Sequence, residues 1–169
     1  TGQAYNAAAG NFTRSIWGGG QPAGTSLEYV NPTTTGNASD FGDLTQSKIG
    51  TGGVSNSTRA LFGGGGTSEV NVISYFTIAS IGDAVDFGDL TQARFYFGAC
   101  SSPTKALWAG GATAAPTSGN HLDTIDYVTI ATTGDAVDFG DMGVAAVATS
   151  GHSSSTRGVF GLGLTPTML

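Results

Sequence analysis

Aspartates are the main candidate chemical groups in this sequence, and most of them belong to one repeated motif. The motif, Gly-Asp-Ala-Val-Asp-Phe-Gly-Asp or a close variant, occurs within residues 36–44, 82–90 and 134–142. Its two later acidic positions hold Asp40, Asp43, Asp86, Asp89, Asp138 and Asp141. Clustered carboxylates are ligands that Ca²⁺ prefers. Side chains three residues apart on a strand point to opposite faces, however, which favours a structural role.

The structural interpretation gives these carboxylates ordinary partners. Asp beside Gly can close an Asx-type turn, and a carboxylate can pair with a basic residue at the start of the next strand. A second motif, Thr followed by a basic residue, apolar residues and glycines, supplies four such cations: Arg14, Arg59, Lys105 and Arg157. Bound Ca²⁺ is the alternative, and no other cofactor is expected. Because the carboxylates recur in every repeat, whereas an active site usually breaks repeat symmetry, we expect no enzymatic activity.

One connection carries a candidate binding loop. Residues 110–123 are six or seven residues longer than the matching connections of the other repeats, and they contain Thr117, Asn120 and His121. Insertions in repeat proteins collect on one face, often the binding face. Amide, hydroxyl and imidazole groups would suit a glycan, while drift of a surface loop is the alternative. The single cysteine, Cys100, is expected to be a buried thiol.

Composition excludes several classes of protein. Charged residues make up 11% of the chain, the net charge is −6, and the six Lys and Arg residues are scattered. Nucleic-acid binding needs clustered basic residues, so we expect none. The apolar runs are shorter than the roughly 18–20 residues of a membrane span, so no span is expected. No leader pattern is seen, and the chain begins at Thr1 without an initiator Met, which suggests a processed chain or a fragment of a longer one.

The two motifs recur with nearly fixed spacing, which defines an internal repeat. Tyr29, Tyr75 and Tyr127 each lie 12 residues before the Phe of the acidic motif, and that Phe lies 17 residues before the next Thr. Only the connection after the glycines varies in length. Constant spacing indicates packed strands, and variable spacing indicates a surface loop. The repeats therefore run over about 13–57, 58–103 and 104–155, with partial repeats at 1–12 and 156–169 in a single domain.

Each repeat reads as four short strands, which predicts an all-β protein. In the second repeat the candidates are the apolar residues 60–62, Val70 to Ala79, which is rich in β-branched and aromatic residues, and Ala93 to Cys100. Asp83 to Leu90, which carries the acidic motif, is a short strand or a turn. Four strands in about 45 residues match the strand number and repeat length of a β-propeller blade. A stacked solenoid is the alternative. Glycine runs at the strand ends fit tight turns better than a phosphate-binding loop, because no Lys or helical pattern follows them.

A resemblance to a known repeat family rests on these residues. A hydrophobic strand ending in a double glycine, then a Tyr, then an aromatic residue about a dozen positions later, resembles the kelch repeat. In kelch blades the later aromatic is usually Trp, whereas here it is Phe41, Phe87 and Phe139. The Asp-Phe-Gly-Asp signature also resembles kelch-like repeats in tail-fibre-type and other virion proteins of bacteriophages. The resemblance implies a β-propeller-like array of four-stranded blades.

Three complete repeats are too few for an ordinary closed propeller, which has four to eight blades. The chain is therefore expected to be a fragment, to complete its ring by association, or to form an arc covered by a neighbour. The resemblance implies a non-enzymatic virion structural protein, located in a tail fibre, tail spike or capsid surface. Its partners would be other virion proteins, copies of itself, or a host surface glycan or receptor. A secreted or cell-surface lectin-like binding module is the alternative.

Overall fold

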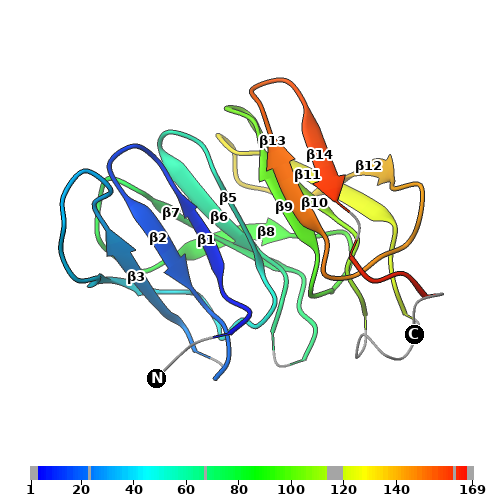
Figure 1. Ribbon diagram of the computed structural model, residues 1–169, viewed down its shortest axis with the longest axis horizontal. Coiled ribbons are helices and arrows are strands. Elements are labelled where there is room, and N and C mark those ends of the chain that lie inside the picture. The colour runs from blue at the N-terminus through cyan, green and yellow to red at the C-terminus, as the bar shows by residue number, and fades with distance from the viewer. Residues whose placement is uncertain (1–3, 23, 67, 114–119, 162, 167–169) are drawn as a thin grey trace.

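The computed structural model describes residues 4–22, 24–66, 68–113, 120–161 and 163–166. Within these residues, 14 strands form antiparallel sheets, and no helix is found. The all-β expectation is confirmed. The strands follow one another in sequence order within each sheet, so every sheet is a simple meander (Figure 1).

Three sheets have four strands and the last has two. Sheet 1 contains β1 (Ala7–Gly10), β2 (Ser15–Gly18), β3 (Ser26–Val30) and β4 (Ser39–Asp43). Sheet 2 contains β5 (Gly52–Ser55), β6 (Arg59–Gly63), β7 (Val72–Thr77) and β8 (Val85–Asp89). Sheet 3 contains β9 (Gly98–Ser101), β10 (Lys105–Ala109), β11 (Thr124–Thr129) and β12 (Val137–Asp141). Sheet 4 contains β13 (Ser150–Ser153) and β14 (Gly158–Gly161).

The Thr–basic motif begins the second strand of each sheet because a polar side chain closes the turn before it. The Asn11 side-chain oxygen accepts hydrogen bonds from the backbone N–H groups of Thr13 and Arg14 at 2.9 and 3.1 Å. Asn56 does the same for the next sheet, and the hydroxyls of Ser102 and Ser154 replace it in the last two. These are the side-chain turns that Asn and Ser favour.

Paired glycines end the second strand of the complete sheets, and both their conformation and their surroundings require glycine. Gly64 and Gly65 have φ values of 55° and 86°. A Cβ atom on Gly64 would lie 2.8 Å from the carbonyl oxygen of Arg94. The glycine run therefore lets two backbones approach closely, a role that other residues fill at a steric cost.

Apolar side chains fill the spaces between consecutive sheets. Phe41, Phe62 and Phe76 pack between sheets 1 and 2, with the rings of Phe41 and Phe76 centred 5.0 Å apart. Phe87 and Trp108 pack in the same way between sheets 2 and 3. The core is thus a series of sheet-to-sheet layers, each made by the same repeat positions.

Two sets of polar contacts join the sheets beside these layers. The first strands β1, β5, β9 and β13 lie next to one another (Figure 1) and are bridged by serines. The hydroxyl groups of Ser55, Ser101 and Ser153 donate to the backbone oxygens of Gly10, Ser55 and Ser101, respectively, at 2.6–2.7 Å. We call these three residues the serine ladder.

At the other side of the sheets, the fourth strand contacts the sheet that follows. The backbone N–H groups of Gly82 and Ala84 donate to the oxygens of Phe41 and Asp43. Gly134 and Ala136 repeat this contact on Phe87 and Asp89. We call the first strand of each sheet its inner strand and the fourth its outer strand. Sheets 1 and 2, and sheets 2 and 3, are therefore joined both at their inner strands and at their outer strands.

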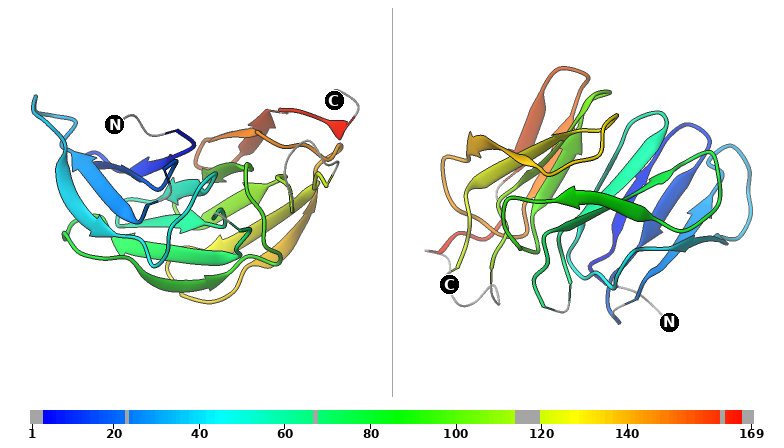
Figure 2. Two further views of the ribbon diagram at one scale, coloured as in Figure 1. Left: turned by 90° about the horizontal axis from the view of Figure 1, so that it is seen from below. Right: turned by 180° about the vertical axis from the view of Figure 1, so that it is seen from behind.

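The four sheets fan out into an arc that does not close (Figure 2). Sheet 1 and the β13–β14 hairpin lie on the two sides of the opening. Each sheet begins one strand earlier than the repeat boundaries drawn at the Thr–basic motif, which fall in the turn between its first and second strands.

The candidate strand Ala93 to Cys100 is wrong in its extent and in its sheet. β9 begins only at Gly98 and is the first strand of sheet 3, not the fourth of sheet 2. Tyr96 has a φ of 58°, a left-handed conformation that interrupts extended backbone. Residues 93–97 are therefore a connection between two sheets.

Candidate functional site

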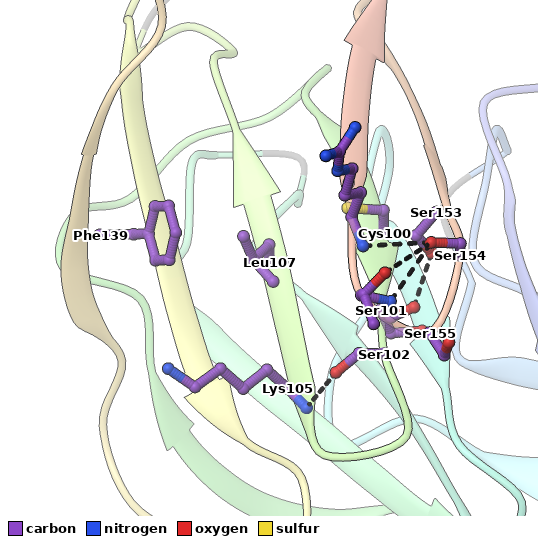
Figure 3. A pocket seen from close by; sticks show the side chains of 12 residues that line it. Cys100, Ser101, Ser102, Lys105, Leu107, Phe139, Ser153, Ser154 and Ser155 are labelled. Carbon is purple, nitrogen blue, oxygen red and sulfur yellow. Dashed lines mark hydrogen bonds between the residues drawn. The ribbon is translucent and has the colours of Figure 1, made fainter.

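A groove at the open end of the arc is the candidate functional site. It lies between sheet 3 and the β13–β14 hairpin and encloses about 180 Å³ (Figure 3). Its apolar residues are Cys100, Leu107 and Phe139, and its polar residues come from the turns of sheets 3 and 4. Lys105 and Arg157 supply positive charge. The groove thus combines an apolar surface with hydroxyl and cationic groups.

The groove exists because no strand packs over Phe139, the third copy of the Phe in the acidic motif. Phe41 and Phe87 are 0% and 2% exposed, whereas the equivalent Phe139 is 56% exposed. In sheet 1 the cover comes from the third strand of the following sheet, where Phe76 contacts Phe41. Sheet 4 has only two strands in the described residues, so no third strand reaches Phe139.

The thiol in the groove is poorly suited to covalent chemistry. Cys100 is buried, and its burial raises the pKa of the thiol. A raised pKa lowers the fraction of thiolate, which is the reactive form. A Cβ atom on Gly158 of β14 would lie 2.7 Å from the Cys100 Sγ atom, so the hairpin covers the sulfur closely. The expectation of a buried thiol is confirmed.

The basic residues of the repeat bind aromatic rings and backbone, not the aspartates of the acidic motif. Arg14 lies over Tyr29 at 5.0 Å and donates to the oxygen of Ile78 at 2.7 Å, in the next sheet. Arg59 lies over Tyr75 at 5.0 Å and donates to the oxygens of Ile130 and Ala131. Lys105 lies over Tyr127 at 4.1 Å. Arg157 is exposed, and among the described residues its sheet has two strands and not the strand that carries the Tyr in other sheets.

The acidic motif makes turns and joins sheets. The Asp83 carboxylate accepts from the N–H of Asp43 at 3.0 Å, and Asp135 accepts from that of Asp89 at 3.1 Å. Asp138 accepts from the N–H of Gly140 at 2.8 Å, which confirms an Asx-type turn there. The expected pairing of these aspartates with the basic residues of the second motif is wrong for the described residues, where the one ion pair joins Arg94 to Asp126.

The remaining aspartates of the motif lie on or near the surface. Asp40 and Asp141 are exposed, and Asp43 accepts from the Thr25 hydroxyl at 2.8 Å. Asp86 and Asp89 line a surface hollow with Thr45, Gln46 and Val72. Across the described ranges, no group of three or more His, Cys, Asp or Glu residues is arranged to hold a metal ion.

The candidate binding loop is only partly described. Thr117 lies outside the described residues. Asn120 is exposed, whereas His121 is 9% exposed and forms a β-bridge with Ala112. The backbone oxygen of Asn120 accepts from the N–H of Thr113 at 3.2 Å. The structure therefore places the imidazole in the protein and leaves the Asn side of the loop towards solvent.

Two buried basic residues were not predicted from the sequence as buried. Arg94 pairs with Asp126 at 2.8 Å, and both side chains are fully buried. Lys48, also fully buried, donates to the oxygens of Gly64 and Val72 at 3.1 and 2.5 Å. Lys48 and Arg94 are 46 residues apart, the same separation as Phe41 and Phe87 of the acidic motif. This spacing could have identified them as equivalent positions of the repeat. The serine ladder carries the same signal, with separations of 46 and 52 residues.

Within the described residues, no helix is long and apolar enough to cross a membrane.

Comparisons with known proteins give a likeness of fold. No family model and no curated protein matches the sequence. Among solved structures 132 chains match, one of them the structure of YjhT, with a TM-score of 0.79 and 7% sequence identity. The match covers 94% of this chain and 56% of that one, so this chain spans about half the length of YjhT. At this identity the likeness shows that the two chains share a fold and carries no function across.

Proposed function

We propose that the four sheets are consecutive blades of a kelch-like β-propeller array that is open at one side. Each complete unit is a four-stranded meander, and the first strands of successive units lie together along the serine ladder. The same positions pack between sheets 1 and 2 and between sheets 2 and 3. These features support blades arranged around a common side more than a stacked solenoid.

We further propose that the protein is a non-enzymatic structural component of a virion, in a bacteriophage tail fibre, tail spike or capsid surface. The observation that carries this proposal is that the recurring polar residues join one sheet to the next. Asp83 and Asp135 hold outer strands, the serine ladder holds inner strands, and Arg14 and Arg59 fasten neighbouring sheets. Such a scaffold would present its loops to a host receptor or to other virion proteins.

Immunogold labelling tests the virion assignment. Antibodies raised against the purified chain should label particles purified from a culture that carries the gene, at a fixed place on each particle. Mass spectrometry of the same particles should detect its peptides at stoichiometric abundance. Label confined to the cell surface or to the culture supernatant would contradict the virion assignment and support the secreted alternative.

A lectin-like module is the second candidate, favoured by one exposed aromatic residue. Phe12 is 93% exposed at the β1–β2 turn, and with Asn11 and residues 55–57 it lines an open groove of about 440 Å³. Aromatic rings with adjacent amide and hydroxyl groups suit sugar rings. A glycan array should then show binding that Phe12→Ala abolishes. Replacing residues 112–121 by a short loop tests the candidate binding loop in the same assay, and wild-type binding by both variants would exclude both surfaces.

A further inference from the structure

The open end of the arc leaves a repeated interface without its second half. Phe139 on β12 is 56% exposed, whereas the equivalent Phe41 and Phe87 are buried. Leu107 on β10 lines the same groove and is partly exposed, whereas its equivalent Leu61 is fully buried. This face of sheet 3 therefore continues an interface that the protein completes elsewhere between its own sheets.

The backbone of sheet 4 is also left half paired. β2, β6 and β10 each pair with strands on both sides, whereas β14 pairs with β13 alone among the described residues. Strands with one free side present backbone donors and acceptors to a further strand. On β12, the oxygens of Phe139 and Asp141 occupy the positions where Phe41 and Asp43 accept from Gly82 and Ala84. A hydrogen-bonding edge and an apolar face thus meet in the groove.

We propose that this groove binds an antiparallel pair of β-strands from a partner polypeptide, which completes sheet 4. The complete sheets specify the chemistry of that pair. Its first strand needs aliphatic or aromatic residues at alternate positions, as in Phe76 and Ile78 or in Val128 and Ile130. It also needs a Tyr on the opposite face, where Arg157 can lie over the ring as Arg59 lies over Tyr75.

A Gly-Asp-Ala turn between the two strands supplies the outer contacts. Its glycine and alanine N–H groups would donate to β12, and its carboxylate would accept from the N–H of Asp141, as Asp135 accepts from Asp89. A second copy of this chain is a poorer occupant. Its outer strands are joined to its own β1 and β2, which would need the space that β13 and β14 already fill.

Residues 124–142 of the chain itself, which contain β11 and β12, provide a probe with this pattern. A fluorescein-labelled peptide of that sequence, titrated with the full chain, should give saturable one-to-one binding by fluorescence anisotropy. Hydroxyl-radical footprinting of the complex, with an isotope-labelled peptide so that its own Phe139 is told apart by mass, should show a severalfold lower oxidation rate at Phe139 of the full chain. Neither readout depends on the virion assignment, so the proposal can fail while that assignment stands.

Matched variants locate the binding. Phe139→Asp and Leu107→Asp, which change apolar residues that line the groove, should each weaken binding by more than about tenfold, because a buried carboxylate would face an apolar strand. Val85→Asp is the control, since Val85 is 57% exposed on sheet 2 and lies outside the groove. A peptide with Val128→Asp and Ile130→Asp should not bind, and circular dichroism should show that every protein variant is folded.

Three results would overturn the proposal. The peptide could fail to bind, or it could bind Phe139→Asp and Leu107→Asp as tightly as the wild type. The chain alone could also sediment as a dimer in which Phe139 resists oxidation, which would make a second copy the occupant of the groove.

Discussion

Two buried cations at equivalent positions of consecutive repeats differ in how their charge is balanced. Arg94 has the carboxylate of Asp126, but at the equivalent place beside Lys48 the chain has Ser74, which shares a 2.6 Å hydrogen bond with Thr45. Burial therefore lowers the pKa of Lys48 from 10.5 to about 7, although Asp86 and Asp89 oppose the shift. Near neutral pH this amine loses its proton inside the folded protein.

The first prediction follows from that lowered pKa. The unfolded chain keeps the Lys48 proton up to about pH 10.5, whereas the folded protein releases it near pH 7. The unfolded state thus binds more protons between these values, and stability rises with pH. The free energy of unfolding should increase by about 2 kcal/mol from about pH 7 to pH 9, and Lys48→Met should remove this increase. Urea unfolding at several pH values measures both.

The exposed Lys105 provides the control, because Lys105→Met should keep the pH dependence. Ser74→Asp provides a second check, since a carboxylate at that place should restore the charged form of Lys48 and flatten the profile. Equal pH dependence in the wild type and in Lys48→Met would contradict the assignment.

The second prediction concerns the fully buried ion pair. Asp126→Asn keeps the size of the side chain but leaves the Arg94 charge without a carboxylate, which costs about 3–5 kcal/mol when a buried partner is removed. Chemical unfolding should show this loss, while Asp123→Asn, at an exposed position, should change stability by less than about 0.5 kcal/mol. A small effect of Asp126→Asn would mean that water reaches Arg94.

For single residues, the sequence predicted whether a side chain has a structural role better than it predicted which groups that side chain contacts. The acidic motif could be interpreted as structural because three-residue spacing places side chains on opposite faces of a strand. Its partners proved to be backbone N–H groups of a neighbouring sheet, since Asp83 and Asp135 reach across the junction. Local spacing does not reveal which strands of distant sheets become neighbours, so the basic residues were paired with the wrong groups.

At the scale of elements, the serine ladder joins the first strands. The Ser101 hydroxyl donates to the oxygen of Ser55 at 2.7 Å and accepts from the Ser55 N–H at 3.4 Å. Ser101 is half-buried between β5 and β9, two strands that belong to different sheets. The ladder therefore substitutes side-chain hydrogen bonds for the backbone pairing that these strands lack.

The third prediction tests the ladder. Ser101→Ala should lower the free energy of unfolding by about 1–3 kcal/mol, because it removes a hydroxyl from partly buried backbone partners. Ser57→Ala, at an exposed turn position, is the matched control and should change it by less than about 0.5 kcal/mol. Thermal or urea unfolding measures the difference, and equal losses in the two variants would mean that the ladder contributes no stability.

Strands were predictable from the sequence where side-chain pattern decides them. β7 falls within the candidate Val70 to Ala79, which is rich in β-branched and aromatic residues, and β8 falls within Asp83 to Leu90, for which the sequence allows a strand or a turn. The run Ala93 to Cys100 has a similar composition, but the left-handed Tyr96 breaks it and Arg94 points into the core. Composition alone does not distinguish a strand from a buried connection.

At the scale of the whole molecule, the arc follows from counting repeats. Within the described part of the chain, three full sheets and half of a fourth leave sheet 3 without a complete following layer. The sequence predicted this shortage of repeats, and the open end agrees with it. The position of the exposed face, on Phe139 and Leu107, became clear only from the packing of the sheets.

Equivalent residues of the repeats lie in equivalent layers between sheets, except where the array stops. Hydroxyl-radical footprinting with mass spectrometry tests it on the free chain, because it measures the solvent exposure of each phenyl ring. Phe139 should be oxidised many times faster than Phe41 and Phe87, which are buried in the first two layers. Slow oxidation of all three rings in a monomeric sample would contradict an open arc, and fast oxidation of all three would contradict the layered packing.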